Sequence, residues 1–198
     1  MIDFRERALI SRIRAGRADA YAEVYDRYAV RLMGYARHLT GDASDAEDLV
    51  QDTLYAAWQG RESCRGTVKL LSWLLGIMSR RWRDRCRSRQ SAAGSLSIED
   101  AEERFPGVMT SATQVESGVI NRLTVDEALA AIPLSHREAV LLIHAQGLTY
   151  AEAAQVLAEP IGTVKWRVSE ALKQMRRRLT AREEELDGLQ QASAGSVV

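Results

Sequence analysis

Apolar residues recur at steps of three and four along most of this 198-residue chain, and this spacing constrains the fold more than any other feature. Residues at such steps share one face of an α-helix, so the pattern predicts amphipathic helices rather than strands. The first such stripe comprises Tyr21, Val24, Tyr25, Tyr28, Leu32, Tyr35, Ala36 and Leu39. The chain has three prolines, and an interior proline costs a helix about 3 kcal/mol. We therefore expect an all-α fold.

Composition divides this fold into two small helical domains joined by a flexible linker. Residues 91–117 are acidic and rich in Ser, Ala and Gly, and no clean period runs through them. We expect a helical domain over 1–90, the linker over 91–117, a helical domain over 118–180 and an acidic tail over 181–198. The tail is expected to be either disordered or a regulatory addition. In the first domain we expect helices over about 21–39, 44–58 and 68–87, with a loop over 60–66.

The net charge of zero is unevenly distributed. Residues 1–90 carry a net charge of +5 and residues 121–180 carry +2, whereas residues 91–120 carry −4 and residues 181–198 carry −3. Binding to nucleic acid depends on local basic patches rather than on the global charge. Both helical domains are therefore candidates for contact with nucleic acid.

Several classes of protein are disfavoured by what the sequence lacks. The two cysteines, Cys64 and Cys86, form no CxxC and have no zinc-like spacing to a histidine, so we expect reduced thiols and no metal site. No stretch approaches the ~18 apolar residues of a membrane span, and no leader is apparent, so we expect a cytoplasmic protein. Nucleotide-binding and hydrolase motifs are missing as well, so we expect no cofactor and no enzymatic activity.

The strongest local signal is a pair of helices near the C-terminus. Thr149–Glu152 has the form of a capping box and opens a short helix that ends near Leu157. Residues 158–160 form a turn, and a long basic helix follows over about 161–179. A second capping box, Ser135–Glu138, opens a preceding helix that Gly147 caps, and a further helix is expected over 123–131. This is the plan of a helix-turn-helix, whose second helix enters the major groove of DNA.

The long helix is expected to have a buried face and a reading face. The buried stripe would be Ile161, Val164, Val168, Leu172, Met175 and Leu179. The DNA-contacting residues would be Thr163, Lys165, Trp166, Arg167, Glu170 and Lys173. Arginine and lysine bond guanine edges, glutamate accepts from cytosine, and threonine contacts a methyl group or a phosphate. The alternative is a plain helical hairpin with a solvated charged face.

Two further clusters lie in the first domain. The arginine run over 80–89 follows Trp73, and arginines attract phosphates while aromatic rings stack on unpaired bases. The alternative is a solvated helix end. Asp45, Asp48 and Asp52 share one helical face, where like charges repel unless a basic group meets them. A metal fits such diverging carboxylates poorly, so a protein partner is the better interpretation.

Three segments together resemble a known family. They are DAEDLVQDTLYAAW at 45–58, Trp73–Leu74 with the following arginine helix, and GLTYAEAAQVLAEPIGTVKWR at 147–167. In this order and spacing they resemble a bacterial RNA polymerase sigma factor of the extracytoplasmic-function (ECF) group. The resemblance implies that the first domain binds the β′ clamp helices of core RNA polymerase. The residues implied in that contact are Asp45, Asp48, Leu49, Gln51 and Asp52.

The same resemblance implies how promoter DNA is recognised. The helix over 161–179 would read the −35 element, and the loop over 62–69 with the helix over 73–87 would hold unpaired bases of the −10 element. The −10 residues implied are Cys64, Arg65, Trp73, Arg80, Arg81, Arg83 and Arg85. An anti-sigma factor is implied as a further partner.

Four residues depart from the pattern of that family. Cys64 replaces a common aromatic residue, and Arg80 stands where asparagine is usual. Trp166 replaces a small residue, and Glu170 replaces a basic one. An alternative function is a helix-turn-helix regulator that never joins core polymerase and whose N-terminal domain senses a ligand or phosphate. Residues 1–90 show neither the strands nor the cavity pattern that such a sensor needs.

Overall fold

The computed structural model describes residues 3–92 and 125–194, and every regular element within those residues is a helix. The first part contains α1 Phe4–Arg14, α2 Ala18–Thr40, α3 Ala43–Gln59, the 3-10 turn η1 Arg61–Ser63 and α4 Leu70–Ala92. The second contains a helix over 125–130, α7 Leu134–Val140, the π-helical turn η2 Leu141–Ala145, α8 Tyr150–Leu157 and α9 Ile161–Ala194. The expectation of an all-α fold is confirmed. The linker expected over 91–117 lies outside the described residues, except for its first two positions in α4.

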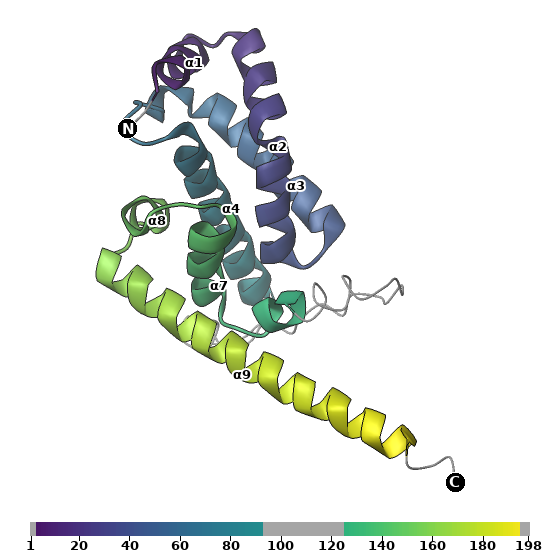
Figure 1. Cartoon of the computed structure of the whole chain (residues 1–198). Helices are drawn as coiled ribbons and strands as arrows, with labels where there is room; N and C mark the ends of the chain where they lie inside the picture. Colours follow the sequence, from purple (N-terminus) through teal and green to yellow (C-terminus); the bar gives the residue numbers. More distant parts are fainter. Residues whose placement is uncertain (1–2, 93–124, 195–198) are drawn as a thin grey trace.

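Helices α2, α3 and α4 pack along one another and enclose the first core (Figure 1). Leu32, Leu49 and Leu74 are fully buried there, and the hydroxyl of buried Tyr35 lies 3.0 Å from the hydroxyl of Ser79. The predicted stripe of α2 is wrong at Tyr25, which is 57% exposed. Adjacent residues differ by ~100° around a helix, so Tyr25 points away from the side that buries Val24.

Helix α1 is an element to which the sequence analysis gave no residue range. Its Leu9, Ile10 and Ile13 are buried, and this apolar face is what attaches a basic segment to the bundle. The Glu6 carboxylate accepts a hydrogen bond from the backbone N–H of Leu70 at 2.7 Å. That contact satisfies a free amide at the start of α4 and places a negative charge at the positive end of the helix dipole. Helix α1 therefore fixes the position at which α4 begins.

The two predicted capping boxes have different outcomes. The box at Thr149 is confirmed, because its hydroxyl accepts from the Glu152 amide and the Glu152 carboxylate accepts from the Thr149 amide. The box at Ser135 is wrong, because α7 already begins at Leu134, after Pro133. A proline suits the N-terminal end of a helix because it has no N–H to leave unsatisfied. The Glu138 carboxylate is bonded to Arg83 of α4 instead.

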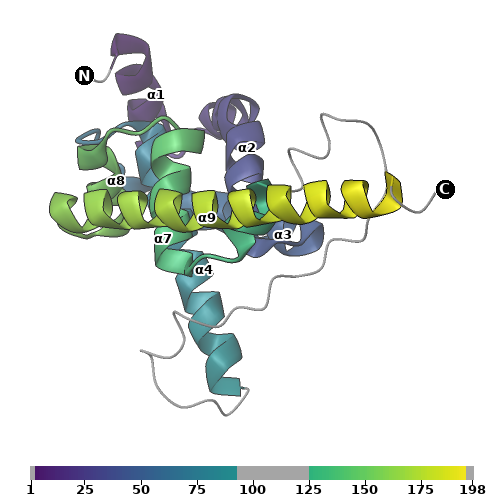
Figure 2. The same cartoon turned by 60° about the horizontal axis from the view of Figure 1, so that its bottom comes forward.

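The predicted buried row of α9 is confirmed at Val164 and Val168, with Met175 half-buried against the core, and is wrong at Ile161 and Leu172. Val164, Val168 and Ala171 are buried, whereas Ile161 is 45% exposed and Leu172 is 39% exposed. A row of four-residue steps drifts ~40° per step around a helix, so the buried row needs a three-residue step, from 168 to 171, to stay on one side. Helix α9 also continues to Ala194, so most of the tail expected over 181–198 has a helical backbone (Figure 2).

The two halves of the chain pack together through α4 and α8. The halves approach closely at Gly76, where an added Cβ would lie 3.8 Å from the Val156 carbonyl oxygen. Lys69 pairs with Glu152 at 2.9 Å, and Arg83 pairs with Glu138 at the same distance. The Glu138 side chain is only 1% exposed, and this burial raises its pKa although Arg83 opposes the shift. The contact between the halves thus combines close helix packing with a buried ion pair.

Candidate nucleic-acid and polymerase interfaces

The outer face of α9 presents three of the six predicted DNA-contacting side chains openly. Trp166 is 60% exposed, and its ring centroid lies 5.3 Å from that of His136 on α7. Lys173 is also exposed, and so is Lys165, whose ammonium lies 5.9 Å from the ring centroid of Tyr150. Two cations and an aromatic ring on one helix surface are suited to phosphates and base edges.

The other three predicted residues of α9 are less available. The Arg167 side chain is only 17% exposed and donates to the Glu159 carboxylate at 2.7 Å. Glu170 accepts from Gln174 at 3.2 Å, and Thr163 is half-buried. Arg167 therefore connects the helix to the turn that precedes it, a role that the sequence pattern did not indicate.

The predicted −10 arginines of α4 fall into two pairs. Arg80 and Arg81 are exposed and make no ion pair with any described residue. Arg83 is half-buried against Glu138, and Arg85 is bonded to Asp52 of α3. Two of these four guanidiniums therefore stabilise the fold in this arrangement, and two are free to meet an anion.

The loop between α3 and α4 presents Arg65 but hides Cys64. Cys64 is 2% exposed, and burial raises the pKa of its thiol to about 11. Its side chain is buried and offers no surface to a base in this arrangement. Trp73 is half-buried and donates from its ring N–H to the Ser63 hydroxyl at 3.3 Å, which links α4 to the loop. Arg65 is exposed beside them.

Two carboxylates on the acidic face of α3 form ion pairs with arginines of α4. Arg89 donates two hydrogen bonds to Asp45, at 2.8 and 3.1 Å, and these lower the pKa of that carboxyl. Asp52 is bonded to Arg85. Asp48 and Gln51 are exposed, whereas Leu49 is completely buried and supports the core of the bundle rather than offering a contact. Asp48 is thus the acidic residue of the predicted set that makes no ion pair with described residues.

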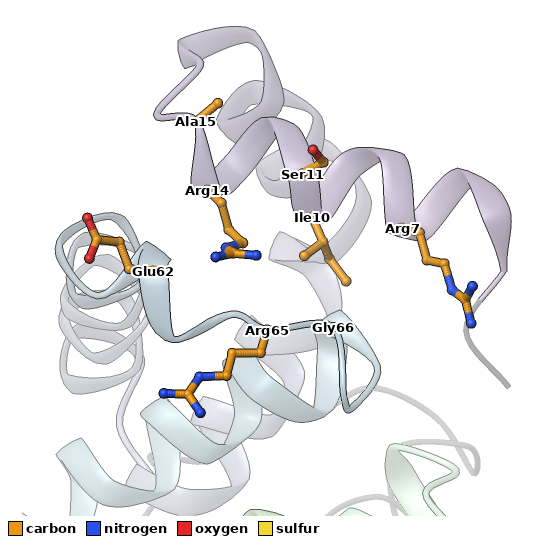
Figure 3. A pocket seen from close by; sticks show the side chains of 8 residues that line it. All are labelled: Arg7, Ile10, Ser11, Arg14, Ala15, Glu62, Arg65 and Gly66. Carbon is orange, nitrogen blue, oxygen red and sulfur yellow. The ribbon is translucent and has the colours of Figure 1, made fainter.

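A cleft of about 660 Å³ lies between α1 and the loop that joins α3 to α4 (Figure 3). Its lining includes three arginines, Arg7 and Arg14 from α1 and Arg65 from the loop, together with Ser11 and Glu62. The two arginines of α1 were not among the residues predicted to bind DNA. The only signal was their seven-residue spacing, which places them on one helical face.

Neither a metal site nor a membrane span occurs in the part of the chain that the structure describes. Among the side chains whose placement is described, no group of three His, Cys, Asp or Glu residues could hold a metal ion. Among the described helices, none has the length and apolar character needed to cross a bilayer.

Comparison with known families finds two matching regions, in order. Residues 24–92 match the model described as Sigma-70 region 2, and residues 122–175 match Sigma-70, region 4. The first match runs from within α2 to the end of α4 and includes the predicted polymerase and −10 residues. The second covers the helix-turn-helix.

Similar proteins extend over nearly the whole chain. The ECF RNA polymerase sigma factor SigL of Mycobacterium tuberculosis is 31% identical, over 85% of this chain and 94% of SigL. The ECF sigma factor SigK of Mycobacterium ulcerans is 32% identical, over 88% of this chain and 93% of SigK.

Solved structures agree in fold. Sigma factor RpoE from Bartonella quintana, crystallised with the anti-sigma factor NepR, matches with a TM-score of 0.67 and 29% identity, over 81% of this chain and 96% of RpoE. CnrH, in complex with the cytosolic domain of CnrY, shares the fold with the same TM-score at 24% identity, over 89% of this chain and 97% of CnrH. With two sigma-70 regions in order and relatives matched over almost their full length, the chain belongs to the ECF group of the sigma-70 family.

Proposed function

We propose that this protein binds core RNA polymerase and directs it to promoters by recognising −10 and −35 elements. The observation that carries the proposal is that sigma-70 regions 2 and 4 occur in order in one chain, the second with an open helix-turn-helix. Such a protein supplies specificity rather than catalysis. We place it in the cytoplasm, where core polymerase and promoter DNA are found.

The proposed −35 contact uses the outer face of α9. Trp166, Lys165 and Lys173 are already exposed there, so they can approach the major groove without rearrangement. Arg167 and Glu170 can join them only after exchanging their bonds within the chain. We therefore assign the first contacts with DNA to the exposed lysines and tryptophan.

The proposed −10 contact uses the loop before α4 and the exposed arginines of α4. Arg65, Arg80 and Arg81 are available in this arrangement. Arg83 becomes available only when α8 and α7 move off α4, because it is bonded to the Leu157 carbonyl of α8 and to Glu138 of α7 here. Promoter melting would thus require the two halves of the chain to separate.

The proposed contact with core polymerase uses the exposed part of the acidic face of α3. Asp48 and Gln51 point outward, and Asp45 and Asp52 lie beside them, neutralised by Arg89 and Arg85. An anti-sigma factor is a further proposed partner, supported by the crystallised complex of the similar RpoE with NepR.

Run-off transcription tests the proposal. The purified full chain is combined with core polymerase and fragments of genomic DNA, and transcripts are mapped. We expect specific transcripts that begin downstream of a shared pair of elements and that core polymerase alone does not make. If the chain bound duplex DNA but never associated with core polymerase, the helix-turn-helix regulator would be the correct function.

A further inference from the structure

The cleft between α1 and the loop before α4 has the character of an anion-binding site. Arg7, Arg14 and Arg65 line it, and none of their three guanidiniums makes an ion pair or a hydrogen bond with another described residue (Figure 3). Elsewhere on α1 the pattern is different, because Arg12 is paired with both Asp19 and Glu23. Figure 3 shows the Arg14 side chain directed into the gap between α1 and the loop, with Arg7 farther along α1 and Arg65 on the loop. Three unpaired positive charges therefore line the cleft at separate points, where an extended anion would lower their mutual repulsion.

The cleft has a fixed shape because α1 is attached at several points. Ile10 lies at its floor and is 4% exposed, and the Ile10 side chain is 3.8 Å from where a Cβ on Gly66 would lie. The bond from the Leu70 amide to Glu6 ties α1 to the start of α4. The arginines on α1 are therefore held at a defined distance from the loop, which reduces the conformational entropy that binding costs.

Nothing in the family match assigns a role to Arg7 or Arg14, the two arginines on α1. The region 2 match begins at residue 24, after α1 has ended. Arg7, Ser11 and Arg14 recur at steps of four and three, so they form one face of α1 that is turned toward the loop.

We infer that α1 forms part of the surface for the unpaired DNA strand, with Arg7, Arg14 and Arg65 binding its backbone phosphates in this cleft. The inference rests on the proposed function and adds to it a second wall of the −10 site. Guanidinium groups bind phosphate oxygens in a two-bond geometry, and the Ser11 hydroxyl is a further donor. Glu62 lies at the end of the cleft near Arg14, where its charge disfavours a phosphate, so the strand would run from Arg14 toward Arg7 rather than past Glu62 (Figure 3).

The cleft remains accessible while the two halves of the chain are packed together. Its lining residues come from α1, from Ala15 directly after it, and from Glu62, Arg65 and Gly66 between α3 and α4. None comes from residues 125–194. The strand can therefore meet the α1 arginines before α8 leaves α4.

The test measures binding of a fluorescent single-stranded oligonucleotide to the complex of the full chain with core polymerase. The oligonucleotide carries the non-template −10 sequence of a promoter identified by run-off transcription. We expect Arg7→Gln and Arg14→Gln each to weaken binding roughly tenfold. The slope of log affinity against log salt should become shallower by about 0.7 for each phosphate of the single strand that the variant no longer neutralises.

Arg5→Gln is the matched control, because Arg5 is exposed on the opposite side of α1 and its substitution removes the same charge. It should bind the strand with the affinity and salt slope of the wild type. If Arg7→Gln and Arg14→Gln behaved like Arg5→Gln, α1 would have no part in the site, while the proposed function would stand. If the wild-type chain failed to join core polymerase, the proposed function would fall and this inference with it.

Discussion

Arginines that look equivalent in the sequence have different environments in the structure. Arg80 and Arg81 face solvent, whereas Arg83 and Arg167 are bonded to carboxylates within the chain. A guanidinium that already holds a carboxylate must give up that bond before it can bind a phosphate or a base. At the scale of single residues, exposure therefore separates contacts that are available at once from contacts that need rearrangement.

The pair of Arg167 with Glu159 should stabilise the turn between α8 and α9. The Arg167 and Glu159 side chains are 17% and 21% exposed, so the pair is more buried than a surface ion pair and less buried than one in the core. We expect Arg167→Ala and Glu159→Gln each to lower the free energy of unfolding by about 1–3 kcal/mol in urea denaturation. Lys173→Ala is the control, since its pair with Glu170 is long and exposed. If Arg167→Ala were as stable as the wild type, the pair with Glu159 would not stabilise the turn, and Arg167 could leave it for DNA at no cost in stability.

Asp48 offers a direct test of the proposed polymerase face. It is exposed and makes no ion pair with described residues, so reversing its charge should not disturb the bundle. We expect Asp48→Lys to abolish association with core polymerase in a pull-down, with an unchanged thermal unfolding curve. Glu47→Lys is the matched control, because Glu47 is exposed on the same helix about 100° away from Asp48. Normal association of Asp48→Lys would remove this face from the interface.

At the scale of elements, helix ends account for most boundaries of the fold. Asp42 caps α3 by accepting from the Asp45 amide, and Gly41 ends α2 with a φ of +73°, in the left-handed region that favours glycine. Thr149 and Glu152 cap α8, the first helix of the helix-turn-helix. Short helices depend on such caps more than long ones, because they have few internal hydrogen bonds.

The cap of α8 should be essential for the helix-turn-helix. Helix α8 contains only eight residues, so its orphan amides are a large share of its backbone. We expect Thr149→Ala to lower the free energy of unfolding by about 1 kcal/mol, measured by urea denaturation. Thr149→Ser keeps the oxygen acceptor and should remain close to the wild type. Equal losses from both substitutions would show that the cap is not the cause.

The same element predicts a dependence of stability on pH. Burial would raise the pKa of Glu152, but bonds from Lys69 and Thr149 outweigh it and lower the pKa to about 2 from an ordinary 4.5. A carboxyl with a lowered folded-state pKa stabilises the protein above its unfolded pKa and loses that contribution as the pH falls through the folded value. We expect the stability difference between the wild type and Glu152→Gln to shrink between pH 4.5 and pH 2. A constant difference over that range would contradict the assignment.

At the scale of the whole molecule, the C-terminal half covers part of the surface proposed to bind the −10 element. Helix α8 lies on α4, Arg83 donates to the Leu157 carbonyl oxygen at 3.4 Å, and Lys69 pairs with Glu152. The buried carboxylate of Glu138 is the group whose pairing depends most on this packing, because it is 1% exposed.

Removing that carboxylate should loosen the packing of the two halves. We expect Glu138→Ala to increase the radius of gyration in small-angle scattering and to raise the affinity of the free chain for single-stranded −10 DNA, since Arg83 becomes uncovered. Glu127→Ala is the control, because Glu127 is exposed and its pair with Arg182 is 3.7 Å long. An unchanged radius and affinity for Glu138→Ala would mean that other contacts hold the halves together.

The sequence by itself determined the helical fold, the breaks at Gly41 and Gly147 and the helix-turn-helix with its Thr149 cap. These features depend on residues within one turn of each other, and local spacing encodes them. The family resemblance, carried by three segments in order, was confirmed by the comparisons.

Tertiary structure alone decided which charged residues are free. Asp45 meets Arg89 across 44 positions, and Arg83 meets Glu138 across 55, so no local period could reveal these pairs. The place of α1 beside the loop, and the cleft between them, have the same origin. Ion pairing and burial depend on how helices pack, and residues distant in the sequence set that packing through contacts that a linear pattern does not contain.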